Sequence, residues 1–186
     1  MLSTTDAIVL SLQPHSDKAH MLHAYTRTGG RINYMVYGLG KKNTSGKYSP
    51  LSILQLTTDK KSIRTAQLSY VPDSIITDPY KRTIAIFISE VLYHVLRHPM
   101  PDEPMFTFIE RAVRELDQST EPQNFHIAFL VDFAAQLGFA MEQTPDFPTT
   151  RSERQKTLHD LCNYFEEHVE TWQNPKSLDI LMDVFD

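Results

Sequence analysis

The fold of the first half of this chain follows from residues 28–57, TGGRINYMVYGLGKKNTSGKYSPLSILQLT. Two apolar-rich runs, residues 32–37 and 51–56, flank a tract rich in glycine, serine and lysine. Short runs bounded by glycine and proline are typical of β-strands, and the tract between them predicts an exposed, cationic loop. Its three lysines supply charge for a phosphate backbone: Lys41, Lys42 and Lys47. The alternative is a solvated hairpin loop without a ligand.

Three more apolar-rich runs surround this stretch and predict further strands, at residues 6–13, 20–26 and 64–71. Gly29 and Gly30 predict a turn before the third strand, since glycine accepts a positive φ without a Cβ penalty. Five short strands within about seventy residues favour a small barrel, because a sandwich usually needs about seven. We therefore expect a five-stranded OB-fold barrel, whose loops and strand faces commonly bind single-stranded nucleic acid.

At Asp78 and Pro79 the hydrophobic period changes from two residues to about 3.6, and these two residues predict a helix start. Apolar stripes then predict helices around residues 84–95, 106–116, 125–137, 158–172 and 178–185, with the first at the centre of a bundle. Thr150 and Glu153 have the spacing of a capping box. The predicted fold class is α+β: an OB-fold barrel over residues 1–77, then an α-helical bundle over residues 78–186.

The charge of this chain is distributed unevenly. Residues 1–77 hold nine Lys or Arg against four Asp, a balance of +5. Residues 78–186 hold nine Lys or Arg against nineteen Asp or Glu, a balance of −10. A basic half joined to an acidic half predicts that the barrel meets a polyanion, while the helices face solvent or proteins.

Catalytic and metal-binding motifs are absent from the sequence. No P-loop, HExxH, GxSxG or GxGxxG pattern occurs, and Cys162 is the single cysteine. His20 and His23 would face opposite sides of a strand, which argues against a metal site there. We expect a non-catalytic protein without cofactor or metal. The lack of a long apolar run or leader-like start predicts the cytoplasm.

The basic residues of the first half are the main functional lead. Tyr34 and Tyr37 lie at odd separation in one strand, so only one of them can face a ligand. We assign Tyr34 to that face, with packing inside the barrel as the alternative. The predicted DNA-binding residues are Arg31, Tyr34, Lys41, Lys42, Lys47, Lys60, Lys61 and Arg64.

Short motifs of the chain resemble the bacterial recombination mediator family RecO. In the first half these are residues 5–10 (TDAIVL), 25–27 (YTR), 30–31 (GR), 36–38 (VYG) and 50–56 (PLSILQL). In the second half they are residues 78–79 (DP), 89–92 (SEVL), 124–130 (NFHIAFL), 137–139 (LGF) and 176–181 (KSLDIL). The resemblance covers nearly the whole chain in order and spacing.

The resemblance implies a DNA repair protein that binds single- and double-stranded DNA and anneals complementary strands. It also implies help in loading the RecA recombinase onto DNA coated with single-strand binding protein, in the cytoplasm at the nucleoid. The implied partners are RecR and the acidic, hydrophobic C-terminal tail of the single-strand binding protein, held by the helical domain. The four-cysteine zinc motif of some members has no counterpart here, and the chain is short for the family around residues 140–157.

A tail-binding site requires an apolar slot beside cations. Arginines stand out in the acidic half, so we predict the site at Arg97, Arg111 and Arg114, with Leu96, Phe108 and Val113 as apolar walls. The alternative is ion pairing within a helix, as between Glu110 and Arg114. For the whole chain the alternative function is a non-catalytic adaptor whose barrel binds a peptide.

Overall fold

The computed structural model describes residues 2–39 and 46–184, which form two compact units. The first unit joins residues 1–72 with residues 96–113, and the second joins residues 73–95 with residues 114–186. The last strand ends at Tyr70 and the first helix begins at Asp73, so the predicted division at residue 77 leaves one five-residue helix with the strands. The compact units differ from it because residues 96–113 pack with the barrel.

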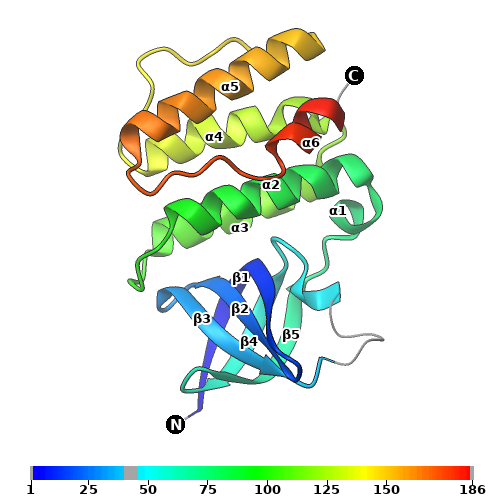
Figure 1. Cartoon of the computed structure of the whole chain (residues 1–186), viewed down its shortest axis with the longest axis vertical. Helices are drawn as coiled ribbons and strands as arrows, with labels where there is room; N and C mark the ends of the chain where they lie inside the picture. The colour runs from blue at the N-terminus through cyan, green and yellow to red at the C-terminus, as the bar shows by residue number, and fades with distance from the viewer. Residues whose placement is uncertain (1, 40–45, 185–186) are drawn as a thin grey trace. The chain divides into compact units, whose positions relative to one another are not determined.

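The first unit contains a closed five-stranded barrel (Figure 1). Its strands are β1 (Leu2–Ser16), β2 (Ala19–Thr26), β3 (Gly30–Tyr37), β4 (Ile53–Asp59) and β5 (Ser62–Tyr70). Around the barrel the order is β1-β2-β3-β5-β4, and β1 pairs with β4 to close it. The one parallel pairing joins β3 to β5, where Met35 lies opposite Ser62. The predicted OB-fold barrel is confirmed.

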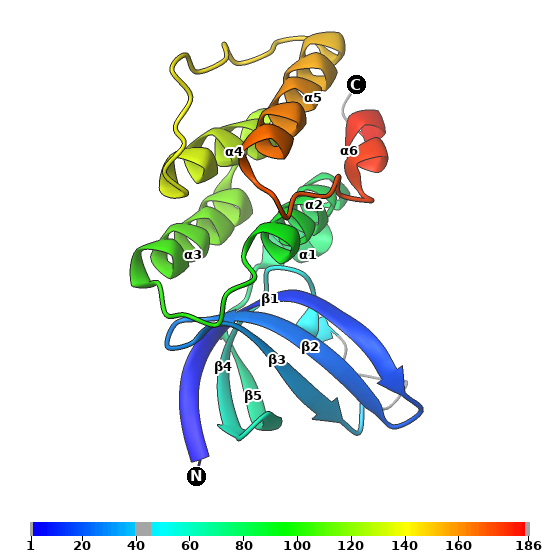
Figure 2. The same cartoon turned by 60° about the vertical axis from the view of Figure 1, so that its left-hand side comes forward.

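Strand β1 closes the barrel because it is long enough to pair with both β2 and β4 (Figure 2). Residues 2–8 pair with β4, residues 7–16 pair with β2, and the register shifts between Val9 and Ser11. Such an irregularity bends a strand and increases its twist. The sequence predicted only residues 6–13, because the ends of β1 are polar and exposed.

Alternation along the strands builds the barrel core. Ile32, Tyr34 and Val36 of β3 face inward, whereas Asn33 and Tyr37 are exposed. Tyr48, from the short 3-10 turn η1 (Gly46–Tyr48), is also buried in this core. The other buried members are Ala7, Val9, Leu22, Ala24, Leu54 and Leu56.

The segment 96–113 packs against the β2–β3 turn within the first unit. Gly30 has a φ of +63°, and a Cβ there would lie 2.2 Å from the Met100 carbonyl oxygen, so glycine is required twice over. Arg27 donates hydrogen bonds to Glu103 and Glu110, and its guanidinium lies 4.2 Å from the Phe106 ring centroid. These contacts attach the first part of α3 (Glu103–Gln118) to the barrel.

Helices make up the second unit. They are α1 (Asp73–Thr77), α2 (Pro79–Val95), the end of α3 after Val113, the 3-10 turn η2 (Pro122–Asn124), α4 (Phe125–Gln136), α5 (Arg151–His168) and α6 (Leu178–Val184). Helix α2 contacts α1, α4 and α6, as expected of the central helix of a bundle (Figure 2). Its buried residues lie around most of its circumference: Lys81, Ile84, Ala85, Phe87, Ile88, Ser89, Val91 and Leu92.

The predicted helix signals at two starts and one end are confirmed. Asp78 Oδ1 accepts a hydrogen bond of 2.8 Å from the Tyr80 backbone N–H at the start of α2. Thr150 and Glu153 form a reciprocal capping box at the start of α5. Gly138, just beyond α4, has a φ of +91°, the left-handed conformation of a helix C-terminus.

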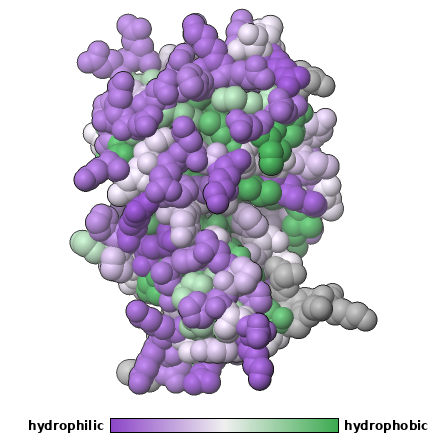
Figure 3. All heavy atoms as spheres, viewed as in Figure 1, coloured by the Kyte–Doolittle hydropathy of each residue, from purple (hydrophilic) through white to green (hydrophobic). Residues whose placement is uncertain are grey.

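None of the helices in residues 2–39 and 46–184 is both long and apolar enough to span a membrane. On the face seen in Figure 3, hydrophilic side chains cover most of the surface and apolar atoms appear in small patches. Single exposed apolar side chains are normal on a folded protein.

Candidate nucleic-acid interface

Two hairpin turns flank the C-terminal end of β3. The Gly38 backbone N–H donates to the carbonyl oxygen of Lys18, in the β1–β2 turn, at 3.4 Å. The Met35 backbone N–H donates to the carbonyl oxygen of Lys61, in the β4–β5 turn, at 2.8 Å. Two turns that are about forty residues apart in the sequence therefore flank one strand end. In OB folds these two loops and the adjoining strand face are a common nucleic-acid site.

Four of the predicted cations lie on or beside β5 near this strand end. Lys60 and Lys61 are exposed in the β4–β5 turn. Arg64, also exposed, pairs with Asp59 at 3.1 Å and thereby lowers the pKa of that carboxyl. Lys47 Nζ donates to the Ala66 carbonyl oxygen of β5 at 3.1 Å. Lys41 and Lys42 lie outside the described residues.

Arg31 lies near the opposite end of β3 and is not part of this group. Its backbone N–H donates to the His98 carbonyl oxygen at 3.1 Å, and its Nη1 donates to the Leu96 carbonyl oxygen at 3.2 Å. At about 3.3 Å per residue, four residues separate Arg31 from Met35 by about 13 Å along the strand. Arg31 therefore fastens the segment after α2 to the barrel.

The assignment of Tyr34 to the ligand face is wrong, and the packing alternative holds. Its side chain is 3% exposed and belongs to the barrel core, where no base can reach the ring. Tyr37, three residues later, is 61% exposed. The sequence contained the signal that distinguishes them: Ile32, Tyr34 and Val36 share one face, whereas Tyr37 shares the other face with polar Arg31 and Asn33.

Sequence reasoning also missed the contribution of the β1–β2 turn. Asp17, Lys18 and His20 line an open groove together with Tyr37, Gly38 and Leu39 of the β3 end. The strand register places Ala19 opposite Tyr37 and His20 opposite Val36. Lys18 stood apart from the other cations in the sequence, and only the pairing of β2 with β3 brings it beside Tyr37.

The predicted tail site on the arginines is wrong in its apolar walls. Phe108 is 6% exposed and Val113 is 1% exposed, so both are core residues and cannot line an accessible slot. Arg97 and Leu96 follow the end of α2 and are not helical. Arg97 and Arg111 are exposed, and Arg114 is half-buried and belongs to the second unit.

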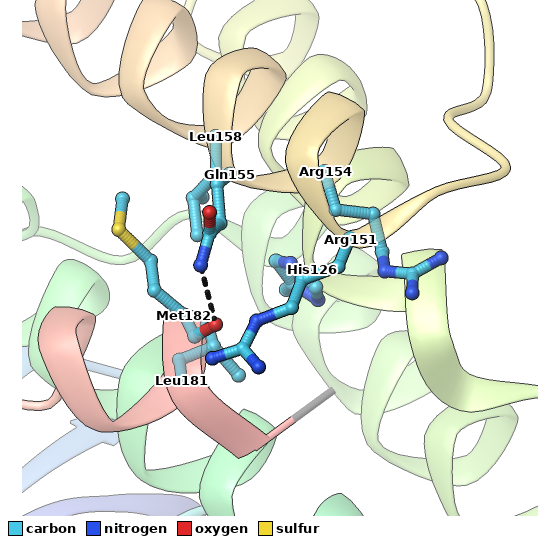
Figure 4. A pocket seen from close by; sticks show the side chains of 7 residues that line it. All are labelled: His126, Arg151, Arg154, Gln155, Leu158, Leu181 and Met182. Atoms are coloured by element: carbon cyan, nitrogen blue, oxygen red, sulfur yellow. Dashed lines mark hydrogen bonds between the residues drawn. The ribbon is translucent and has the colours of Figure 1, made fainter. Parts of the chain in front are cut away.

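The second unit has a small pocket in which cations and apolar groups do meet (Figure 4). Its lining comes from α4, α5 and α6: His126, Arg151, Arg154, Gln155, Leu158, Leu181 and Met182. Gln155 Nε2 donates to the Met182 carbonyl oxygen at 3.0 Å, and Arg151 pairs with Asp183 at 3.1 Å. The free volume of about 10 Å³ suits about one water molecule. A bulky side chain would enter only if α6 shifted.

Burial shifts the pKa values of two groups in the second unit, His126 and Cys162. Burial, with the charge of Arg154, lowers the pKa of His126 to about 3, so the imidazole is neutral near pH 7. Burial raises the pKa of Cys162 to about 12, which leaves its thiol protonated and a poor nucleophile. No cluster of three or more His, Cys, Asp or Glu suited to a metal ion occurs among the described residues.

Comparison with known proteins gives matches along both halves of the chain. The family described as "Recombination protein O N terminal" matches residues 1–80, and "Recombination protein O C terminal" matches residues 76–177. The chain belongs to the RecO family. Relatives of the chain bear the name "DNA repair protein RecO", which supports a role in DNA repair.

Relatives of the RecO family differ from this chain in length. The protein of Phocaeicola vulgatus is 30% identical over 173 residues, covering 88% of this chain and 69% of that relative. A Porphyromonas gingivalis relative is 31% identical over 150 residues, covering 74% of this chain and 61% of that relative. The Flavobacterium psychrophilum protein is 28% identical over 233 residues, covering 97% and 98%. That alignment is longer than the 186 residues of this chain, so the RecO relative has additional residues within the matched span.

Proposed function

We propose that this chain binds single- and double-stranded DNA through its barrel and anneals complementary strands. It would also help to load the RecA recombinase onto DNA coated with single-strand binding protein. The observation that carries the proposal is that the Lys18 turn and the Lys60–Lys61 turn both bond to the chain at the C-terminal end of β3. RecO-family membership supports the same role.

The mechanism is electrostatic. Each lysine or arginine that neutralises a phosphate releases a condensed counterion, and this release favours binding without regard to sequence. Two strands held on one cationic surface repel each other less and can pair. In this scheme the chain is not an enzyme, because the basic side chains screen charge and break no bond.

The second unit would recruit proteins. The tail of the single-strand binding protein, which the family resemblance describes as acidic and hydrophobic, needs cations beside an apolar slot. The pocket of Arg151, Arg154, Leu158 and Leu181 groups cations with apolar side chains. Leu158 and Leu181 are buried, so the tail would enter only as α6 shifts. RecR is a further proposed partner, and the nucleoid is the proposed location. Under this scheme residues 1–77 bind DNA and residues 78–186 bind proteins.

Strand annealing tests this function in the intact chain. Two complementary labelled strands are mixed with and without single-strand binding protein, and pairing is followed by fluorescence transfer. The double variant Lys60→Gln, Lys61→Gln should slow annealing under both conditions, since both strands lose charge screening. Arg151→Gln, which changes a partly exposed side chain, should slow only the annealing of coated strands.

Lys176→Gln is the matched control, because it removes an exposed charge from the second unit outside the pocket. Its annealing rates should equal those of the wild type. If the wild-type chain leaves both annealing rates unchanged, the mediator function is refuted and the peptide-binding adaptor gains support.

A further inference from the structure

Tyr37 is the exposed aromatic residue at the end of β3, and hydrogen-bonded backbone surrounds it. Its side chain is 61% exposed, yet its backbone is held by pairing opposite Ala19 of β2. The next residue, Gly38, is tied to Lys18 by a backbone hydrogen bond of 3.4 Å. The ring therefore stands on fixed backbone, with little need for ordering when a ligand binds.

Gly38 lines the groove beside Tyr37 and carries no side chain. It has a φ of +70°, and a Cβ built on it would meet no atom within 4 Å. The left-handed conformation, and not crowding, is what favours glycine here. The next residue, Leu39, joins the lining of the groove.

The groove offers two kinds of contact side by side. Tyr37 provides a flat aromatic surface, and Lys18 of the β1–β2 turn provides a cation. The bond from the Gly38 N–H to the Lys18 carbonyl oxygen fixes the backbone of that turn beside β3. The Lys60–Lys61 turn lies two residues back along β3, since Met35 bonds to the Lys61 carbonyl oxygen. An aromatic surface bordered by cations on both sides matches the alternation of base and phosphate in a nucleic-acid strand.

We propose that Tyr37 is a stacking platform for one unpaired nucleobase, with the neighbouring phosphates held by Lys18 and the Lys60–Lys61 turn. The inference rests on the proposed function, because it assumes that the barrel binds DNA, and it adds a ligand preference. A base inside a duplex already stacks on its neighbours and presents only its edge. The Tyr37 contact is thus available to single strands alone, and it makes the barrel prefer them over duplex DNA.

Substitution of Tyr37 tests the stacking contact. Fluorescence anisotropy of a labelled single strand and of a duplex of equal length gives the two dissociation constants for the wild-type chain, Tyr37→Ala and Tyr37→Phe. Tyr37→Ala should weaken single-strand binding by about 5- to 150-fold, the range for loss of one stacked base. Duplex affinity should stay within about twofold, and Tyr37→Phe should behave like the wild type, because it keeps the ring.

A single strand with abasic sites separates stacking from other effects. If the ring stacks on a base, the abasic strand binds the wild-type chain more weakly, and Tyr37→Ala adds little further loss. Lys18→Gln should instead weaken both DNA forms and lower the salt slope by about 0.7–0.9, as expected for one phosphate contact.

The possible failures are distinguishable. An unchanged single-strand affinity in Tyr37→Ala, or an equal loss for single strand and duplex, would overturn the stacking inference and leave the proposed DNA binding in place. A wild-type chain that binds neither DNA form would overturn the proposed function and this inference with it. Thermal unfolding of each variant checks that the exposed position tolerates the change.

Discussion

His126 is a residue whose surroundings determine its charge. It lies 2% exposed on α4, packs edge-on against Phe87 with ring centroids 6.2 Å apart, and feels the charge of Arg154. Burial and that charge lower its pKa to about 3, so the folded protein holds the neutral imidazole. The unfolded chain regains the ordinary pKa of about 6.5.

This difference makes stability depend on pH with a defined sign. Because the folded pKa is the lower one, the stabilising effect is complete above about pH 6.5 and is lost as the pH falls toward 3. Between pH 7 and pH 5, the free energy of unfolding of His126→Leu should fall by about 1–2 kcal/mol less than that of the wild type. Urea unfolding at both pH values measures this loss. His23, whose pKa burial also lowers, still contributes in the variant.

His159→Gln is the control, since that histidine is exposed on α5. It should leave the pH dependence as in the wild type. Equal losses of stability between pH 7 and pH 5 in the wild type and in His126→Leu would show that His126 does not cause this pH dependence.

Tyr34 and Tyr37 show how far the sequence predicts the orientation of single side chains. Alternation correctly predicted that only one of them faces outward. The choice between them depends on the residues that share each face of the strand. The face with the more polar residues is the outer one, and Tyr37 lies on it. Lys18 was beyond such reasoning, because its place beside Tyr37 depends on the pairing of β2 with β3.

Helix α5 depends on its capping box. Glu153 accepts hydrogen bonds from the Thr149 and Thr150 backbone N–H groups, and these bonds lower its pKa to about 2. The Thr150 side chain accepts in return from the Glu153 N–H at 3.2 Å. The cap fixes where α5 begins, and hence where Arg151 and Arg154 lie.

Removal of the cap should destabilise the second unit. Thr150→Ala leaves one helix N–H without its partner and should lower the free energy of unfolding by about 1 kcal/mol. Chemical denaturation measures the change, and Ser152→Ala, an exposed position in the first turn, is the comparison expected to differ little from the wild type. An effect of Ser152→Ala as large as that of Thr150→Ala would argue against the cap.

Element boundaries were predictable where a local signal marks them. The starts of α2 and α5 carry such signals, but the end of α5 does not. The predicted stripe runs to Trp172, whereas α5 ends at His168 and Val169 is extended. Trp172 is buried against Phe165 from outside the helix, with ring centroids 5.1 Å apart, so apolar periodicity overstates the length. The five-residue α1 was missed because it is too short for a stripe.

The sequence predicts the class and order of the two parts of the molecule, but not how their sites assemble. The pocket of the second unit draws residues from α4, α5 and α6, which no local pattern connects. The predicted arginine cluster failed because two of its walls, Phe108 and Val113, are needed in the core. Lys47, Lys60, Lys61 and Arg64 lie on or beside β5, as barrel topology brings hairpin turns to the ends of strands, and their role in DNA binding stays a prediction.

The central claim, that cations at the end of β3 hold a nucleotide polymer, is tested most directly by salt dependence. The dissociation constant of a labelled oligonucleotide is measured across salt concentrations for the wild type, for Lys60→Gln with Lys61→Gln, and for Lys156→Gln with Lys176→Gln on the second unit. We predict a linear log–log dependence whose slope falls by about 1.4–1.8 in the β4–β5 turn variant only. An identical slope in all three proteins would contradict the account.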